Sequence, residues 1–301
     1  MPLRIGYVRE HFSSPLLQYA EADQNKTFTL VECPSGTGQL ISRLTNDEID
    51  VAIALTDPLI SGIANGSKAY KLVGSYVSTP LNWAVITGTE AKYNSIADLK
   101  DTTIGISRQG SGSQTMAYVM ALQQGWPSED LKFKINNDIH GLIKSVNDGS
   151  TSAFMWEWFT TKPFVDAKEC RFIGSVPTPW PSWLIAARPT TPSDDLREFL
   201  TSLSTYVKAF DSPDSRASRN VEFIKTQFGY PKEDILANHT SYIYAYFQLQ
   251  AWLKTVGYPD DCLTIETKVI TDTLSVLQKA GVVKGEFDVN QFVDTAVVTL
   301  V

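Results

Sequence analysis

Short apolar runs alternate with amphipathic stretches along the N-terminal part of the chain. The apolar runs are rich in β-branched and aromatic residues, which favour strands. Between the runs, apolar residues recur at helical spacing, as Leu40, Ile41 and Leu44 do. Asp57–Pro58 is a typical helix start. This first set predicts strands over 3–8, 28–33, 50–55, 70–77 and 81–87, with a helix after each of the first three strands.

A second set of the same kind follows. Its first helix is expected to end near Gly125, and its second carries Ile139, Leu142 and Val146 on one face. Such repeated alternation is typical of α/β proteins with largely parallel sheets. The strands of this set are expected over 102–107, 131–136 and 152–156, a further strand over 183–188, and a mostly helical region over 193–301.

Composition describes a globular protein and argues against several partners. With 301 residues, 43% hydrophobic and 20% charged, the chain can bury a sizeable core. A net charge of -7 and the lack of a basic stripe argue against a nucleic-acid surface. No run of about 18 apolar residues offers a membrane span, and no signal-peptide pattern stands at the N-terminus. If Met1 is the native start, the protein is expected to be cytoplasmic.

The residue types that build metal and catalytic sites are scattered along the chain. The three cysteines form no CxxC pair, and the three histidines lack metal-ligand spacing. Neither a GxSxG elbow nor the lysine of a Walker loop is present. We therefore expect no metal and no cofactor, and the catalytic residues, if any, are unknown.

Two loops at expected helix starts carry small and hydroxyl-bearing residues, Ser35–Gln39 and Gly110–Gln114. In open α/β sheets, ligands bind beyond the carboxyl ends of the strands, where these loops lie. Glycine lets a ligand approach the backbone, and free N–H groups with the helix dipole favour an anionic or strongly polar group. One such loop in each set favours a shared cleft for a polar ligand. Ordinary N-capping is the alternative explanation for each loop.

Tryptophans near strand ends are the second candidate feature. Trp156 and Trp158 flank Glu157, and Trp83 follows a proline-containing connection. One tryptophan would stack on a ring while the Glu157 carboxylate accepts hydrogen bonds from an amine. Alternatively, the tryptophans belong to the core and Glu157 caps the next helix, where the dipole favours a negative charge.

Three segments resemble one known fold: GTGQLISRLTNDEIDVAIALTDP, NSIADLKDTTIGISRQGSGSQTMAYVMAL and GVVKGEFDVNQFVD. They are similar to the type II periplasmic-binding-protein fold, in the branch of bacterial sulfonate-, nitrate- and pyrimidine-precursor-binding proteins. The fungal pyrimidine synthase of thiamine biosynthesis belongs to the same branch. The resemblance implies two α/β lobes that are joined by two crossovers and close on a small molecule. It places the first part of lobe 1 at 1–88, lobe 2 at 89–182, and the return to lobe 1 with the C-terminal helices at 183–301, with crossings near 88–92 and 178–183.

The same resemblance implies which residues face the cleft. Ser14 stands where the pyrimidine-precursor branch has a histidine, and ALTDPLI lacks the lysine and histidine of the fungal synthase. The cysteine-rich iron motif of that synthase is absent as well, so its chemistry is not expected here. The expected ligand-binding residues, with Trp156 taken from the tryptophan pattern, are Ser14, Thr37, Gly38, Thr56, Asn82, Trp83, Ser111, Gly112, Ser113, Trp156 and Glu157.

These features favour a small-molecule-binding protein over an enzyme. The expected ligand is a small polar metabolite of anionic or heteroaromatic character, such as a thiamine-pathway pyrimidine or its phosphate. Two alternatives stay open: a thiamine-biosynthesis-type enzyme with relocated catalytic residues, and the solute receptor of an ABC-type importer whose export signal was removed. Neither nucleic acid nor a membrane span is expected, and protein partners are unspecified.

Overall fold

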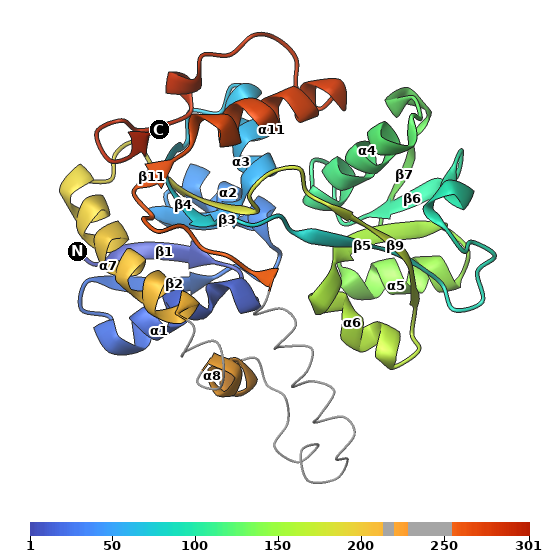
Figure 1. Ribbon diagram of the computed structural model, residues 1–301, viewed down its shortest axis with the longest axis horizontal. Coiled ribbons are helices and arrows are strands. Elements are labelled where there is room, and N and C mark those ends of the chain that lie inside the picture. Colours follow the sequence, from blue (N-terminus) through green and yellow to red (C-terminus); the bar gives the residue numbers. More distant parts are fainter. Residues whose placement is uncertain (213–219, 228–254) are drawn as a thin grey trace.

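The computed structural model describes residues 1–212, 220–227 and 255–301. Two five-stranded sheets, each flanked by helices, form two lobes that lie side by side (Figure 1). This two-lobed α/β architecture confirms the fold class predicted from the sequence.

The first lobe combines N-terminal strand–helix units with a returning strand and C-terminal helices. Its elements are β1 (Leu3–Tyr7), η1 (His11–Ser13), α1 (Ser14–Asp23), β2 (Phe28–Glu32), α2 (Thr37–Thr45), β3 (Val51–Leu55), α3 (Thr56–Ala64), β4 (Lys71–Val77), β10 (Trp183–Ala187), α7 (Ser193–Asp211), α8 (Asn220–Gln227), β11 (Thr264–Ile265), α11 (Thr267–Lys279), η5 (Val289–Gln291) and β12 (Thr299–Leu300). The sheet has the order β2-β1-β3-β10-β4, in which only β10 is antiparallel to its neighbours. β11 and β12 form a separate short parallel pair.

The second lobe repeats this plan. Its elements are β5 (Asn82–Thr87), η2 (Ile96–Leu99), β6 (Thr103–Ile106), α4 (Gly112–Gln124), η3 (Ser128–Asp130), β7 (Lys132–Ile135), α5 (Ile139–Asn147), β8 (Ala153–Glu157), α6 (Trp158–Asp166) and β9 (Arg171–Pro177). The sheet order is β7-β6-β8-β5-β9, and β5 is the antiparallel strand. Each sheet therefore contains one antiparallel strand that is adjacent in sequence to a crossing between the lobes.

The first crossing lies elsewhere than the sequence suggested. β4 belongs to the first sheet and β5 to the second, so the chain crosses at residues 78–81 and not near 88–92. A strand pattern does not reveal which sheet the strand joins, because its pairing partners, β8 and β9, are distant in sequence. The chain returns between β9 and β10, over residues 178–182. β9 itself was not predicted, because this edge strand is mostly half-exposed and lacks a buried apolar face.

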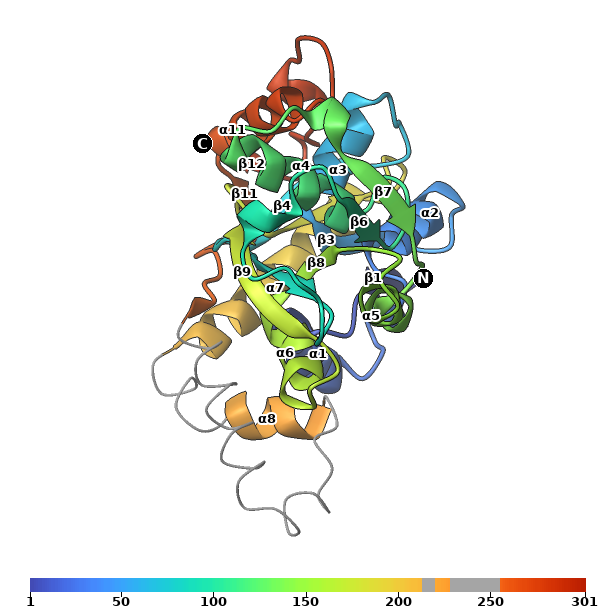
Figure 2. The same ribbon diagram turned by 90° about the vertical axis from the view of Figure 1, so that its right-hand side faces the viewer.

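The two lobes touch along α4. This helix packs against α3 and α11 of the first lobe, and the three helices lie together in both views (Figure 2). Met116 and Met120 of α4 belong to the same buried apolar cluster as Ile60 and Leu277 from those two helices. Apolar contact therefore holds the lobes together on one side of the space between them.

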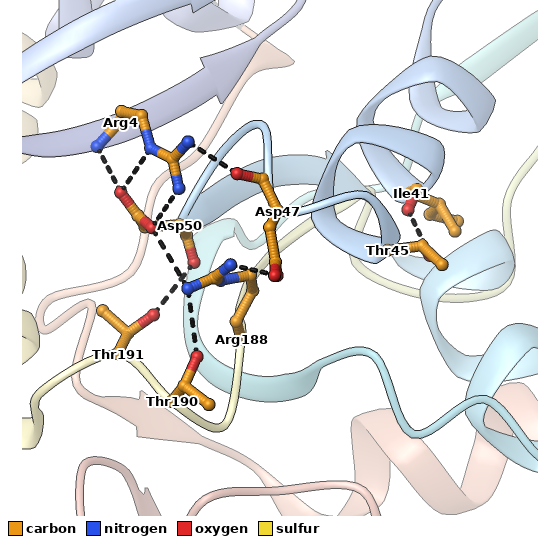
Figure 3. Close-up of polar contacts among 8 residues, drawn as sticks. All are labelled: Arg4, Ile41, Thr45, Asp47, Asp50, Arg188, Thr190 and Thr191. Atoms are coloured by element: carbon orange, nitrogen blue, oxygen red, sulfur yellow. Dashed lines mark hydrogen bonds and ion pairs between the residues drawn. The ribbon is translucent and has the colours of Figure 1, made fainter.

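A group of charged side chains connects β1, β3 and β10 at the end of the first sheet where its parallel strands begin (Figure 3). Arg4 on β1 donates to Asp50 from Nε at 3.0 Å and from Nη2 at 2.7 Å. Arg188, which follows β10, places Nη2 3.7 Å from the same carboxylate. Burial raises the pKa of Asp50, but the hydrogen bonds and charge of Arg4 outweigh it and leave this pKa below its usual value. Because it lies at the amino ends of the parallel strands, we assign this group a structural role.

No helix in the described ranges combines the length and apolar character needed to cross a membrane.

Candidate functional site

A cavity of about 570 Å³ lies between the two lobes. Its walls come from the segments that follow β1, β2 and β3 in the first lobe and β6, β7 and β8 in the second. These segments follow the carboxyl ends of the strands, where open α/β sheets bind ligands. The volume is typical of small-molecule sites, which occupy roughly 300–1,000 Å³.

Most of the expected ligand-binding residues line this cavity, and three do not. Those in its wall are Thr37, Gly38, Trp83, Ser111, Gly112, Ser113, Trp156 and Glu157. Ser14 is buried at the start of α1, where its hydroxyl donates to the His11 carbonyl at 2.7 Å. The Thr56 hydroxyl donates to the carbonyl of Pro181 at 2.5 Å and thus fixes the second crossing. Asn82 begins β5 opposite Pro177 and lies outside the lining.

The start of α4 offers open hydrogen-bond donors to the cavity. Ser111 is the N-cap, and its Oγ lies 2.9 Å from the Ser113 Oγ. The Gly110 N–H is already used, since it donates to Gln114 Oε1 at 2.7 Å. The N–H groups of Gly112 and Ser113 have no acceptor among the described residues. They are two of the donors that the first turn of any helix leaves unpaired.

The start of α2 faces the cavity from the other lobe. The N–H groups of Thr37 and Gly38 likewise find no acceptor in the described part of the chain. Thr37 Oγ1 accepts the Leu55 N–H at 3.2 Å, which leaves the hydroxyl proton available for donation. Two helix N-termini, one from each lobe, therefore present free donors and positive dipole ends to one cavity.

Arg108 is a cavity residue that the sequence did not single out, although it directly precedes the glycine–serine loop. Its guanidinium lies across the Cα of Gly38, and Nη1 donates to the Ser35 carbonyl at 3.3 Å. A Cβ atom on Gly38 would stand 2.3 Å from Arg108 Nε, so only glycine admits this contact. Arg108 forms no ion pair with any described residue, and burial lowers its pKa. The cavity thus contains a cation that forms no ion pair with a described residue.

Three tryptophans form much of the apolar wall. Trp83 packs on the start of α4, and a Cβ on Gly112 would lie 3.0 Å from its Cη2. The indole nitrogens of Trp83 and Trp183 are buried without an acceptor among the described residues. Trp156 lines the cavity, but Trp158 does not, because α6 begins at Trp158 and its ring packs on Phe172 at 4.0 Å between centroids.

Three carboxylates complete the charged lining: Asp138, which caps α5 by accepting the Gly141 N–H at 2.8 Å, and Glu10 and Glu157 from opposite lobes. Glu157 satisfies both interpretations of the sequence: it caps α6, accepting the Thr160 N–H at 2.6 Å, and it lines the cavity. Burial raises its pKa. Glu10, in the loop after β1, was not expected, and it carries no motif that would have identified it. Burial and the charge of Glu157 raise the pKa of Glu10 to about 8.

The described residues contain no group of three or more His, Cys, Asp or Glu side chains placed to hold a metal ion. The lining instead combines backbone donors, hydroxyls, one guanidinium, three carboxylates and aromatic rings. Such a set recognises a small organic molecule through hydrogen bonds, charge and stacking.

Comparison with known structures identifies the family. The Candida albicans CA3427 gene product, reported to define a new family with the generic periplasmic binding protein fold, is 30% identical with a TM-score of 0.86. The alignment covers 100% of this chain and 98% of that chain. The chain belongs to the Ca3427-like family. A family profile described as Ca3427-like PBP matches residues 83–176, which span β5 to β9.

Members of the predicted sulfonate and nitrate branch share the fold of this Ca3427-like protein. The alkanesulfonate-binding protein SsuA from Xanthomonas axonopodis pv. citri, bound to MOPS, has a TM-score of 0.74 at 16% identity, covering 100% of this chain and 98% of that chain. The periplasmic nitrate-binding protein NrtA from Synechocystis PCC 6803 has a TM-score of 0.67 at 11% identity, covering 96% and 83%. The resemblance predicted from the sequence is confirmed. No curated protein sequence matches this chain significantly.

Proposed function

We propose that this Ca3427-like protein binds a small organic anion that carries an aromatic or heterocyclic ring. A thiamine-pathway aminopyrimidine phosphate is the compound that we favour. The observation that carries this proposal is the meeting of two helix N-termini with an unpaired Arg108 in one interlobe cavity. An anion placed there satisfies donors from both lobes at once.

The anion is expected to lie against the N–H groups of Gly112 and Ser113, with Arg108, Thr37 and Gly38 on the other side. Hydrogen bonds to a charged group contribute about 1.5–3 kcal/mol each, compared with about 0.5–1.5 for neutral pairs. Two or three such bonds contribute about 3–9 kcal/mol in total, so burial of the ring must supply the rest of the binding free energy against the roughly 4–15 kcal/mol cost of lost translational and rotational freedom. No metal is needed for this mode of recognition.

The ring is expected to contact Trp83 or Trp156, with the Glu157 carboxylate accepting from an amino group. An indole face supplies a stacking surface that tolerates different heterocycles. The anionic part of this proposal is supported by SsuA and NrtA, which share the fold and are described as alkanesulfonate- and nitrate-binding proteins. The pyrimidine part rests on the aromatic wall alone.

The first experiment is native mass spectrometry of the freshly purified protein. We expect an adduct with the mass of a small acidic compound that dissociates unchanged on dialysis. Conversion of that compound into a product would favour the enzyme alternative. Thermal melting with aminopyrimidine phosphate then tests the site, since ligand at about 100 times Kd adds about 2.7 kcal/mol of stability. With the same ligand concentration, the increase should fall to about 0.4–1.4 kcal/mol in Arg108→Gln for a tenfold to hundredfold loss of affinity, and persist in Arg197→Gln, a matched change of an exposed arginine on α7.

A further inference from the structure

The cavity contains a second charged centre that an anion does not explain. Glu10 follows β1 in the first lobe, and Glu157 ends β8 in the second. The Glu10 side chain accepts no hydrogen bond and forms no ion pair with any described residue. The other charged residues of the lining supply no partner, because Arg108 forms no ion pair and Asp138 is itself acidic. Glu10 and Glu157 thus line one cavity, and neither forms an ion pair with a described cationic side chain.

The residues next to Glu10 in the chain do not neutralise it either. Arg9 points to other partners, with Nη1 3.9 Å from Glu32 and Nη2 donating to the carbonyl of Gln227. Burial lowers the pKa of His11 to about 4, so this ring is neutral near pH 7. The pKa of Glu10 is raised by burial and, to a smaller extent, by the negative charge of Glu157, and no positive charge lowers it.

The order of the strands separates this acidic pair from Arg108. Glu10 follows β1, which neighbours β2, the strand that leads to α2 and Gly38. Glu157 ends β8, which neighbours β6, the strand that leads to Arg108. The acidic pair and the basic centre therefore follow different strands of each sheet.

We infer that Glu10 and Glu157 together bind a positively charged nitrogen, and that the ligand is a zwitterion whose anionic group lies at Arg108 and the helix starts. This inference rests on the proposed anion site and adds the second charge. Trp156 and Trp183 line the same cavity, and aromatic faces stabilise cations by about 0.5–2 kcal/mol. Burial and the charge of Glu157 raise the pKa of Glu10 to about 8, so binding of the cation near pH 7 should release the proton that Glu10 carries without ligand, and that proton passes to the buffer.

The test compares two series of probes by isothermal titration calorimetry at pH 7. One series is ω-aminoalkanesulfonates, which carry an ammonium group, and the other is ω-hydroxyalkanesulfonates, each with two to five methylene groups. At the best chain length, we expect the ammonium compound to bind at least about tenfold more tightly, a difference of about 1.4 kcal/mol. Titrations in imidazole and in Tris, two cationic buffers of different ionisation enthalpy that do not compete for the anion site, should show release of up to one proton for the ammonium compound and none for the hydroxyl compound.

The variant Glu10→Gln should reduce the preference for ammonium to less than about threefold and remove the proton release. The Glu10 side chain makes no hydrogen bond or ion pair with a described residue, so this change should not disturb folding. Thermal melting of the variant checks that point. Glu129→Gln, an exposed change on η3 in the second lobe, is the matched control and should behave as the parent.

Three results would overturn the inference. Equal affinity for both series would leave the anion site standing and remove the cation site. An ammonium preference that survives in Glu10→Gln would place the recognition elsewhere. Failure of every sulfonate in both series, with aminopyrimidine phosphate still bound, would remove the zwitterion and leave the anion site; failure of aminopyrimidine phosphate as well would remove both.

Discussion

Gly38→Ala tests the contact between the two lobes at the basic centre. The added methyl group would stand 2.3 Å from Nε and 2.5 Å from Cζ of Arg108, so the guanidinium must leave its place above α2. Because the guanidinium is the end of a flexible side chain, the displacement should cost little in folding. Alanine is favoured over glycine within helices by up to about 1 kcal/mol, so the variant should melt at or above the temperature of the parent.

The effect on binding should have the opposite sign. Loss of one hydrogen bond to a charged group corresponds to about 1.5–3 kcal/mol, which is a roughly tenfold to hundredfold loss of affinity. Isothermal titration calorimetry with aminopyrimidine phosphate measures this loss. The double variant Gly38→Ala/Arg108→Ala should bind as weakly as Arg108→Ala alone, because residues that act through one contact are not additive. Parent-like affinity in Gly38→Ala, or additive losses in the double variant, would refute the assigned role of Arg108.

The remaining predictions concern the α4 loop and two aspartates. Ser111→Ala should weaken binding of aminopyrimidine phosphate by no more than about tenfold to a hundredfold. Gly112→Val should weaken it more, because a side chain at this position meets Trp83. If calorimetry shows parent-like binding in both variants, this loop is only a helix cap. Burial raises the pKa of Asp57 to about 7, so the folded state loses stability as pH rises from about 4 to about 7. Asp57→Asn should therefore raise the melting temperature more at pH 8 than at pH 5, and an equal change at both would contradict the burial argument. Asp50→Asn should lower the unfolding free energy at pH 7 by about 1–3 kcal/mol and by less below pH 4, because the pKa of Asp50 is lowered in the folded state; denaturant unfolding at both pH values measures the difference.

The strands and helices were predictable because each has a local signature. Strands buried on both faces, such as β3 and β10, are continuous apolar runs, and the helices carry one apolar face. β9 lacked such a signature because it is an edge strand, and the sheet that β5 joins depends on partners far along the chain. Long-range pairing decides both features.

The candidate site was predictable only where it follows directly from strand ends and helix starts. The loops before α2 and α4 fall in this class, and both line the cavity. Ser14 and Thr56 were expected in the site from the family resemblance, but their hydroxyls donate to the backbone carbonyls of His11 and Pro181. Glu10 and Arg108 were missed because a single charged loop residue has no periodic signal, and its role depends on the residue that it meets from the other lobe. The cytoplasmic location expected from the first residues stays a prediction.

Titration of the parent protein with aminopyrimidine phosphate, and with the same aminopyrimidine without its phosphate, tests the central claim most directly. The account predicts one binding site for the phosphate, and an affinity at least about tenfold lower for the neutral compound, since the charged hydrogen bonds to Arg108 and α4 are lost. Equal affinities for the two compounds, or no binding of the phosphate, would contradict the claim that this interlobe cavity is an anion-binding site.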